Sequence, residues 1–240
     1  MSGHSKWATI HRKKGLIDAQ RGKIFQKLTK EIMVAAKSGS PDPAQNSALR
    51  LAVDKAKAQN MPKDNIENAI KKAAGIGDNV NYEHIVYEGY GPSGVAIMVD
   101  CLTDNKNRTA AAVRSTFTKH GGNLGTDGSV SYMFKYSGSI VVPSDYDENM
   151  IMETCLEAGA DNVDKEEETY LITTSANDFS SVKDALSNAG VSEFLECELT
   201  YVPIIYSDVD DETKDKVYKI LDALDDIDDV QEVYNNLKEE

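Results

Sequence analysis

The chain has 240 residues, of which 40% are hydrophobic and 28% charged, and its formal net charge is −14. That composition is ordinary for a globular protein, and the longest apolar run, near Gly94–Leu102, is too short to cross a bilayer. The N-terminus is polar and basic without an apolar signal segment, so we expect a cytoplasmic protein with no membrane partner.

The charge is divided unevenly along the chain. Residues 1–75 hold fifteen Lys and Arg against six Asp and Glu, a net charge of +9, whereas the remaining residues carry −23. A basic block attracts polyanions, which indicates nucleic-acid binding by the first third of the chain. The alternative is that the basic head simply attracts the acidic remainder of the same chain.

The first fifteen residues lack apolar periodicity and are predicted to form an arm. The arm combines cations, which can pair with phosphates, with Trp7, whose indole can stack on an unpaired base. Packing of Trp7 against the helices that follow is an equally good interpretation. The arm residues that are candidates for nucleic-acid contact are Lys6, Trp7, His11, Arg12, Lys13 and Lys14.

Three helices are predicted after the arm. The first runs over Asp18–Ser38, with an apolar face that includes Leu28 and Ile32 and a basic stripe on the opposite side. The second is predicted to open at Asp42-Pro43, an N-cap followed by a first-turn proline, and the third runs from Pro62 to Gly75. The candidate phosphate contacts on the first helix are Arg21, Lys23, Lys27 and Lys30.

From Tyr82 the pattern changes to alternating strands and helices. The expected elements are a strand over Val95–Leu102, a helix over Asn105–His120 and a strand over Ser129–Tyr136. Arg108 and Lys119 share one face of this helix, and no acid occurs between Asn105 and Thr126. The helix is therefore a candidate second polyanion contact, with an intrachain salt bridge as the alternative.

A compact βαββαβ run follows, which is typical of a ferredoxin-like unit. Its elements are predicted over Ser139–Pro143, Asp147–Ala158, Asp161–Lys165, Thr169–Thr174, Asp178–Ala189 and Glu193–Val202. A strand over Ile204–Ser207, a helix over Asp211–Leu224 and a strand over Val230–Tyr234 can complete the unit begun at Val95.

The prediction is therefore an α+β fold with a basic three-helix domain and two ferredoxin-like α/β domains, one inserted into the other. The predicted domains are 1–78, the discontinuous 79–136 with 204–240, and the inserted 137–203.

The sequence contains no catalytic or cofactor motif that is flanked by the structural elements such a motif requires. Gly89-Tyr90-Gly91-Pro92-Ser93-Gly94 matches G-x-G-x-x-G, but it runs into strand sequence rather than a helix and suits a turn. The sequence has no P-loop, no G-x-S-x-G elbow and no metal-ligand spacing among its histidines. The three cysteines are far apart and are interpreted as reduced core residues. We expect no enzyme, no cofactor and no metal site.

Several long motifs resemble the YebC/PmpR family. They are Met-Ser-Gly-His-Ser-Lys-Trp at the start, Ala58-Gln59-Asn60-Met61-Pro62-Lys63-Asp64-Asn65-Ile66, Tyr87-Glu88-Gly89-Tyr90-Gly91-Pro92, and Leu102-Thr103-Asp104-Asn105-Lys106-Asn107-Arg108-Thr109. The resemblance covers essentially the whole chain and implies three domains, the third inserted into the second. It also implies a cytoplasmic, DNA-binding transcriptional regulator.

The same resemblance includes a mitochondrial translational activator and a link to ribosomes stalled at proline-rich stretches. Three functions thus stay open: a DNA-binding regulator, a translation factor bound to ribosomal RNA, and a protein-binding adaptor whose basic head docks on its own acidic body. The favoured function is nucleic-acid binding through the basic head, with DNA and the ribosome both retained as partners.

Overall fold

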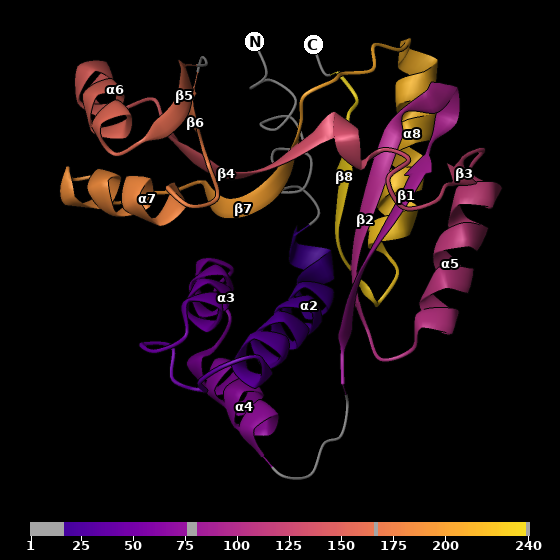
Figure 1. The fold of residues 1–240 in the computed structure, drawn as a ribbon, viewed down its shortest axis with the longest axis horizontal. Coiled ribbons are helices and arrows are strands. Elements are labelled where there is room, and N and C mark those ends of the chain that lie inside the picture. The colour runs from indigo at the N-terminus through magenta and orange to yellow at the C-terminus, as the bar shows by residue number, and fades with distance from the viewer. Residues whose placement is uncertain (1–16, 76–80, 166–167, 239–240) are drawn as a thin grey trace. The chain divides into compact units, whose positions relative to one another are not determined.

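The computed structural model describes residues 17–75, 81–165 and 168–238. The described residues form two compact units, one containing those up to Val130 together with Val209–Asn235 and the other built on Ser131–Asp208. Helices and antiparallel sheets contribute to the fold, which confirms the predicted α+β class (Figure 1). The division into domains 1–78, 79–136 with 204–240, and 137–203 stays a prediction. Among the described residues, no helix combines the length and the apolar character that crossing a membrane requires.

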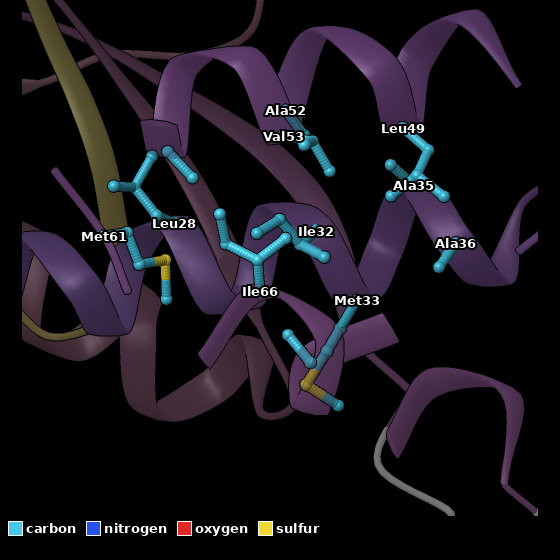
Figure 2. Packing of buried hydrophobic residues seen from close by; sticks show 12 residues of the cluster. Leu28, Ile32, Met33, Ala35, Ala36, Leu49, Ala52, Val53, Met61 and Ile66 are labelled. Atoms are coloured by element: carbon cyan, nitrogen blue, oxygen red, sulfur yellow. The ribbon is translucent and has the colours of Figure 1, made fainter. Parts of the chain in front are cut away.

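The basic part of the first unit consists of three helices: α2 (Ile17–Lys37), α3 (Ser47–Ala58) and α4 (Lys63–Ala74). The predicted apolar face of α2 is buried, with Leu28 4% and Ile32 0% exposed. Figure 2 shows these side chains gathered with Leu49 of α3 and Ile66 of α4. Because α2 is amphipathic, burying this face turns the lysines on its opposite side out of the helical core.

Helix α3 begins at Ser47, and the predicted start at Asp42-Pro43 is wrong. The N-cap is Asn46, whose side-chain oxygen accepts a hydrogen bond from the N–H of Leu49 at 3.1 Å. Asp42 instead accepts from the main chain two residues further on, which closes a tight turn. Both side chains can cap a helix, but only Asn46 also carries donors for the chain that precedes it.

Replacing Asn46 with alanine is expected to lower the free energy of unfolding by about 2 kcal/mol. The amide of Asn46 donates to the carbonyls of Ala35 and Ser40 at 2.8 and 2.9 Å, so its loss removes three hydrogen bonds to the backbone. Urea unfolding followed by far-ultraviolet circular dichroism measures the change. The exposed Asp42→Ala serves as the control, and a loss there as large as at Asn46 contradicts the assignment of the cap.

The first sheet has the strand order β3-β1-β2-β8, with every neighbouring pair antiparallel. Its strands are β1 (Glu83–Tyr90), β2 (Ala96–Thr103), β3 (Asn123–Leu124) and β8 (Val230–Asn235). Helices α5 (Lys106–Lys119) and α8 (Asp211–Asp225) pack on it, and Phe117 and Ile220 are fully buried there. Since α8 and β8 come from the far end of the chain, the second unit is inserted between β3 and α8.

The second sheet has the strand order β5-β6-β4-β7 and is also antiparallel. Its elements in chain order are β4 (Phe134–Pro143), α6 (Glu148–Glu157), β5 (Ala160–Lys165), β6 (Thr169–Thr174), α7 (Phe179–Asn188) and β7 (Glu196–Pro203). This is the predicted βαββαβ order of a ferredoxin-like unit. The first sheet also has four strands and two helices, but its chain order is β1-β2-α5-β3 followed by α8-β8.

The strands predicted over Ser129–Tyr136 and Ser139–Pro143 are one continuous strand, β4. The break was expected near Gly138, but this glycine serves close packing rather than a turn. A Cβ there would overlap the Thr174 hydroxyl and lie 2.5 Å from a ring carbon of Phe179. Glycine lets β6 and α7 approach the strand at this point.

Two segments that were predicted to lie in strands do not form strands in the structure. Val130 donates its N–H to the buried carboxylate of Glu88, and Ser131–Met133 form a single 3₁₀ turn before β4. The strand predicted over Ile204–Ser207 is reduced to one isolated bridge between its last residue and Leu237.

All three cysteines are free thiols, as predicted. Cys101 and Cys155 are fully buried, and burial raises the pKa of these thiols to about 12 and about 11. A thiol with so high a pKa is neutral and unreactive at neutral pH. Cys197 is only partly buried.

Candidate nucleic-acid interface

The structure describes half of the residues predicted to contact nucleic acid. The arm residues lie outside the described ranges: Lys6, Trp7, His11, Arg12, Lys13 and Lys14. The others lie on two helices, namely Arg21, Lys23, Lys27 and Lys30 on α2, and Arg108 and Lys119 on α5.

Three lysines on one side of α2 lie against an acidic turn that links α8 to β8. We call the lysines the lysine stripe (Lys23, Lys27 and Lys30) and the turn the acidic turn (Asp225–Asp229). Lys23 Nζ lies 2.8 Å from Asp226 Oδ1, and Lys27 Nζ lies 2.8 Å from Asp225 Oδ1. Residues spaced by three and four positions share a helix face, so one face of α2 meets consecutive residues of the turn.

The third member of the stripe, Lys30, has the most buried carboxylate as its partner. Lys30 Nζ lies 3.1 Å from Asp229 Oδ1 and donates to the main-chain carbonyl of Asp228 at 2.7 Å. Lys27 similarly donates to the carbonyl of Asp225 at 3.1 Å. The side chains of Lys27 and Lys30 are each only 17% exposed, whereas that of Lys23 is 46% exposed. Two of the three lysines of the stripe are therefore covered.

Asp229 is the point at which α2, α5 and the acidic turn meet. Its side chain is 7% exposed. Its Oδ2 accepts hydrogen bonds from Arg108 Nη2 at 2.6 Å and from Thr109 Oγ1 at 2.8 Å, while Oδ1 accepts from Lys30. Thr103 Oγ1 adds a longer contact of 3.3 Å to Oδ2. A nearly buried carboxylate with this many donors is held ionised and in one orientation.

The ionisation of these groups follows from their partners. Burial by itself raises the pKa of Asp229, but the hydrogen bonds from Arg108, Thr109 and Lys30 outweigh it and lower the pKa below its usual value. The hydrogen bond to Asp226 raises the pKa of Lys23, and the carboxylates around Arg108 raise the pKa of its guanidinium. Each of these three shifts favours the charged form of its group, so Asp229, Lys23 and Arg108 are charged at neutral pH.

Of the two predicted residues on α5, one is paired within the chain. Arg108 binds both Asp229 and Asp104, at 2.6 and 2.7 Å, which is the intrachain alternative. Lys119 is exposed and forms no ion pair with any residue that the structure describes, and the same holds for Arg21 on α2.

Sequence reasoning missed two further cations of this kind, Arg50 on α3 and Arg114 on α5. Each is exposed and has no ion pair within the described ranges. The signal for Arg114 was present, because it lies in the same acid-free segment as Lys119. The acidic turn was also missed as the specific partner, since the sequence indicates only a general attraction between the basic head and the acidic remainder of the chain.

The glycine-rich motif is a connection between strands. Gly91–Gly94 joins β1 to β2 through one 3₁₀ turn, and Gly94 has a positive φ of 79°. A dinucleotide site needs a strand followed by a helix N-terminus, which this hairpin lacks. Among the described residues, no group of His, Cys, Asp or Glu has an arrangement that could hold a metal ion.

The second sheet has the element order of RNA-recognition modules, which stack bases on aromatic side chains of the open sheet face. In β4, Gly138 faces α7, so the alternate residues Ser137, Ser139 and Val141 lie on the face away from α7, where all three are buried. The adjacent residues of β6 on this face are Thr169, Leu171 and Thr173, of which the first two are also buried. These two central strands, described throughout, present no aromatic ring on that face, which argues against base stacking there.

Comparisons with known proteins cover the whole described chain. Residues 5–76 match the family model described as the TACO1/YebC protein N-terminal domain, and residues 82–237 match the TACO1/YebC second and third domain. A probable transcriptional regulatory protein of Hathewaya histolytica is 54% identical over 98% of this chain and 96% of its own length. A protein of the same description from Geobacter sulfurreducens is 55% identical over 98% and 95%. The crystal structure of a conserved hypothetical protein from Aquifex aeolicus is similar, with a TM-score of 0.83 and 46% identity over 93% of both chains.

Proposed function

The chain belongs to the TACO1/YebC family, and we propose that it is a regulator that binds nucleic acid through the cations of its N-terminal third and catalyses no reaction. Relatives more than half identical to it are named probable transcriptional regulatory proteins, which supports a regulatory role and favours DNA as the ligand. Ribosomal RNA offers the same phosphate chemistry and is the alternative ligand.

The observation that carries the proposal is the concentration of cations at the start of the chain. Residues 6–21 contain five Lys and Arg against one acid, in a protein whose net charge is −14. Arg21, the last of the five, is exposed on α2 and has no ion-pair partner among the described residues. Since an overall acidic protein is repelled by a polyanion, productive contact requires such a local basic segment.

The arm and Arg21 are proposed as the first contact. Lys27 and Lys30 are covered by the acidic turn, so they are less accessible to a phosphate than the arm. On α5, Lys119 together with Arg114 is the second proposed contact, and Arg108 is left to its intrachain pairs. These contacts address phosphates, so we expect sequence preference to come from the shape of the nucleic acid.

The test is a salt titration of binding to a mixed-sequence DNA duplex, followed by fluorescence anisotropy. Neutralising Lys6, Arg12, Lys13 and Lys14 with glutamine is expected to flatten the slope of log K against log salt by up to roughly 3.6, because each phosphate contact contributes about 0.9. The matched control neutralises four exposed lysines of the acidic part: Lys165, Lys216, Lys219 and Lys238. Equal slopes for the two variants contradict the proposal.

The alternative ligand is tested in parallel. A single-stranded RNA and purified ribosomes replace the duplex, with sedimentation as the readout for ribosomes. Tighter binding to ribosomes than to the duplex at equal salt, lost in the arm variant, assigns the ligand as ribosomal RNA. Failure of the full chain to bind any of the three overturns the proposed function.

A further inference from the structure

The lysine stripe has two competing anionic partners, a nucleic-acid phosphate and the chain's own acidic turn. We propose that the acidic turn is an intramolecular competitor, which covers the stripe when no nucleic acid is bound and gives it up when phosphates take its place. This inference rests on the proposed function, because it concerns how the same basic surface is regulated.

The geometry of the contact supports competition. Carboxylate oxygens lie 2.8, 2.8 and 3.1 Å from the three Nζ atoms of the stripe, the distances that phosphate oxygens take from lysine. With Lys27 and Lys30 17% exposed, a phosphate cannot reach either ammonium group until the turn moves. The stripe is therefore either paired internally or available to nucleic acid.

The position and exposure of Asp225 and Asp226 favour release of the lysine stripe by the acidic turn. Asp225 and Asp226 lie at the C-terminus of α8, where the helix dipole disfavours negative charge, and both are partly exposed, at 39% and 59%. The Lys23–Asp226 pair is exposed on both sides, and exposed pairs are weak and are screened by salt. Asp229 keeps Arg108 and Thr109 as partners when Lys30 leaves, so the turn stays attached to the first sheet.

Competition has a signature in salt dependence. When the stripe passes from the turn to phosphates, the phosphates release counter-ions while the freed carboxylates take counter-ions up. The uptake offsets part of the release, so the stripe contributes less to the salt slope of the natural chain than free lysines would. Without the carboxylates, each freed lysine contributes about 0.9 to the magnitude of the slope on duplex DNA.

The experiment compares Asp225→Asn/Asp226→Asn with the full natural chain, using the same duplex. Freeing Lys23 and Lys27 is expected to steepen the slope by up to roughly 1.8 and to raise affinity about tenfold near physiological salt. The control is Asp211→Asn/Asp215→Asn, which changes the net charge equally at the other end of α8, where both acids are exposed. A slope and affinity equal to those of the control overturn the inference.

A second measurement reads the stripe directly. Lysine acylation followed by mass spectrometry is expected to label Lys27 faster in the Asp225→Asn/Asp226→Asn variant, and duplex DNA is expected to protect it again. Unchanged labelling of Lys27, with hydrogen exchange showing β8 intact, overturns the inference independently of affinity. If the natural chain binds the duplex but Asp225→Asn/Asp226→Asn behaves like its control, only the inference fails. If the natural chain binds neither the duplex, nor single-stranded RNA, nor ribosomes, the proposed function fails.

Discussion

Replacing Asp229 with alanine is expected to destabilise the first unit by about 3 kcal/mol, the cost of removing one partner from a nearly buried ionic group. The carboxylate is 7% exposed and serves donors on α2, on α5 and at the end of β2. Its loss leaves the Thr109 hydroxyl and the ammonium of Lys30 without their carboxylate acceptor. Arg108 is half-exposed and keeps Asp104, which limits the loss.

The effect is measured by urea unfolding, with hydrogen exchange of the β8 and α5 peptides to locate it. The control is Asp226→Ala, where an exposed pair is removed and about 1 kcal/mol or less is expected. Equal losses at the two positions contradict the role of Asp229 as the meeting point.

The difference in stability between the natural chain and the Asp229→Ala variant changes with pH in a defined direction. Because the pKa of Asp229 is lowered in the folded state, its stabilising contribution is present above the unfolded value of about 3.9 and is lost as pH falls through the folded value. The difference between the natural chain and the alanine variant should therefore be constant near neutral pH and shrink in strong acid.

Local periodicity predicted most of the elements. Helix α2 was predicted from the spacing of Leu28 and Ile32, and the βαββαβ run from its alternating strand and helix patterns. Strand β1 was not predicted, because Glu88, a charged residue, occupies one of its buried positions. Its carboxylate accepts from the N–H groups of Gly128 and Val130, a pairing that no local pattern reveals.

In the candidate interface, too, local sequence patterns do not reveal which residues pair across the fold. The lysine stripe was evident from sequence, because a helix places positions three and four apart on one face. Its partner was not, because Lys23 and Asp226 are 203 positions apart and meet only through the tertiary fold. Charge counting predicted that the two ends of the chain attract one another or a polyanion, and the structure contributes the pairing between them.

The glycines of the motif from Gly89 to Gly94 have different structural roles, and substituting them one at a time distinguishes these roles. Gly89→Ala is expected to destabilise the first sheet by about 2–3 kcal/mol, the upper part of the range for overpacking. A Cβ at Gly89 would lie 2.7 Å from the carbonyl oxygen of Asn123 and 2.7 Å from a ring carbon of Phe117. The carbonyl belongs to β3, which pairs with β1 at this point, so it cannot retreat without breaking the pairing.

Gly94→Ala is the matched comparison within the same motif. Its φ of +79° disfavours alanine by about 1 kcal/mol, but a Cβ there meets open space. Urea unfolding of both variants, with hydrogen exchange of β1 and β3, is expected to rank Gly89 above Gly94. A larger loss at Gly94 would mean that turn conformation governs this motif; the predicted order means that close packing of β1 against β3 and α5 governs it, which accounts for the glycines without a bound nucleotide.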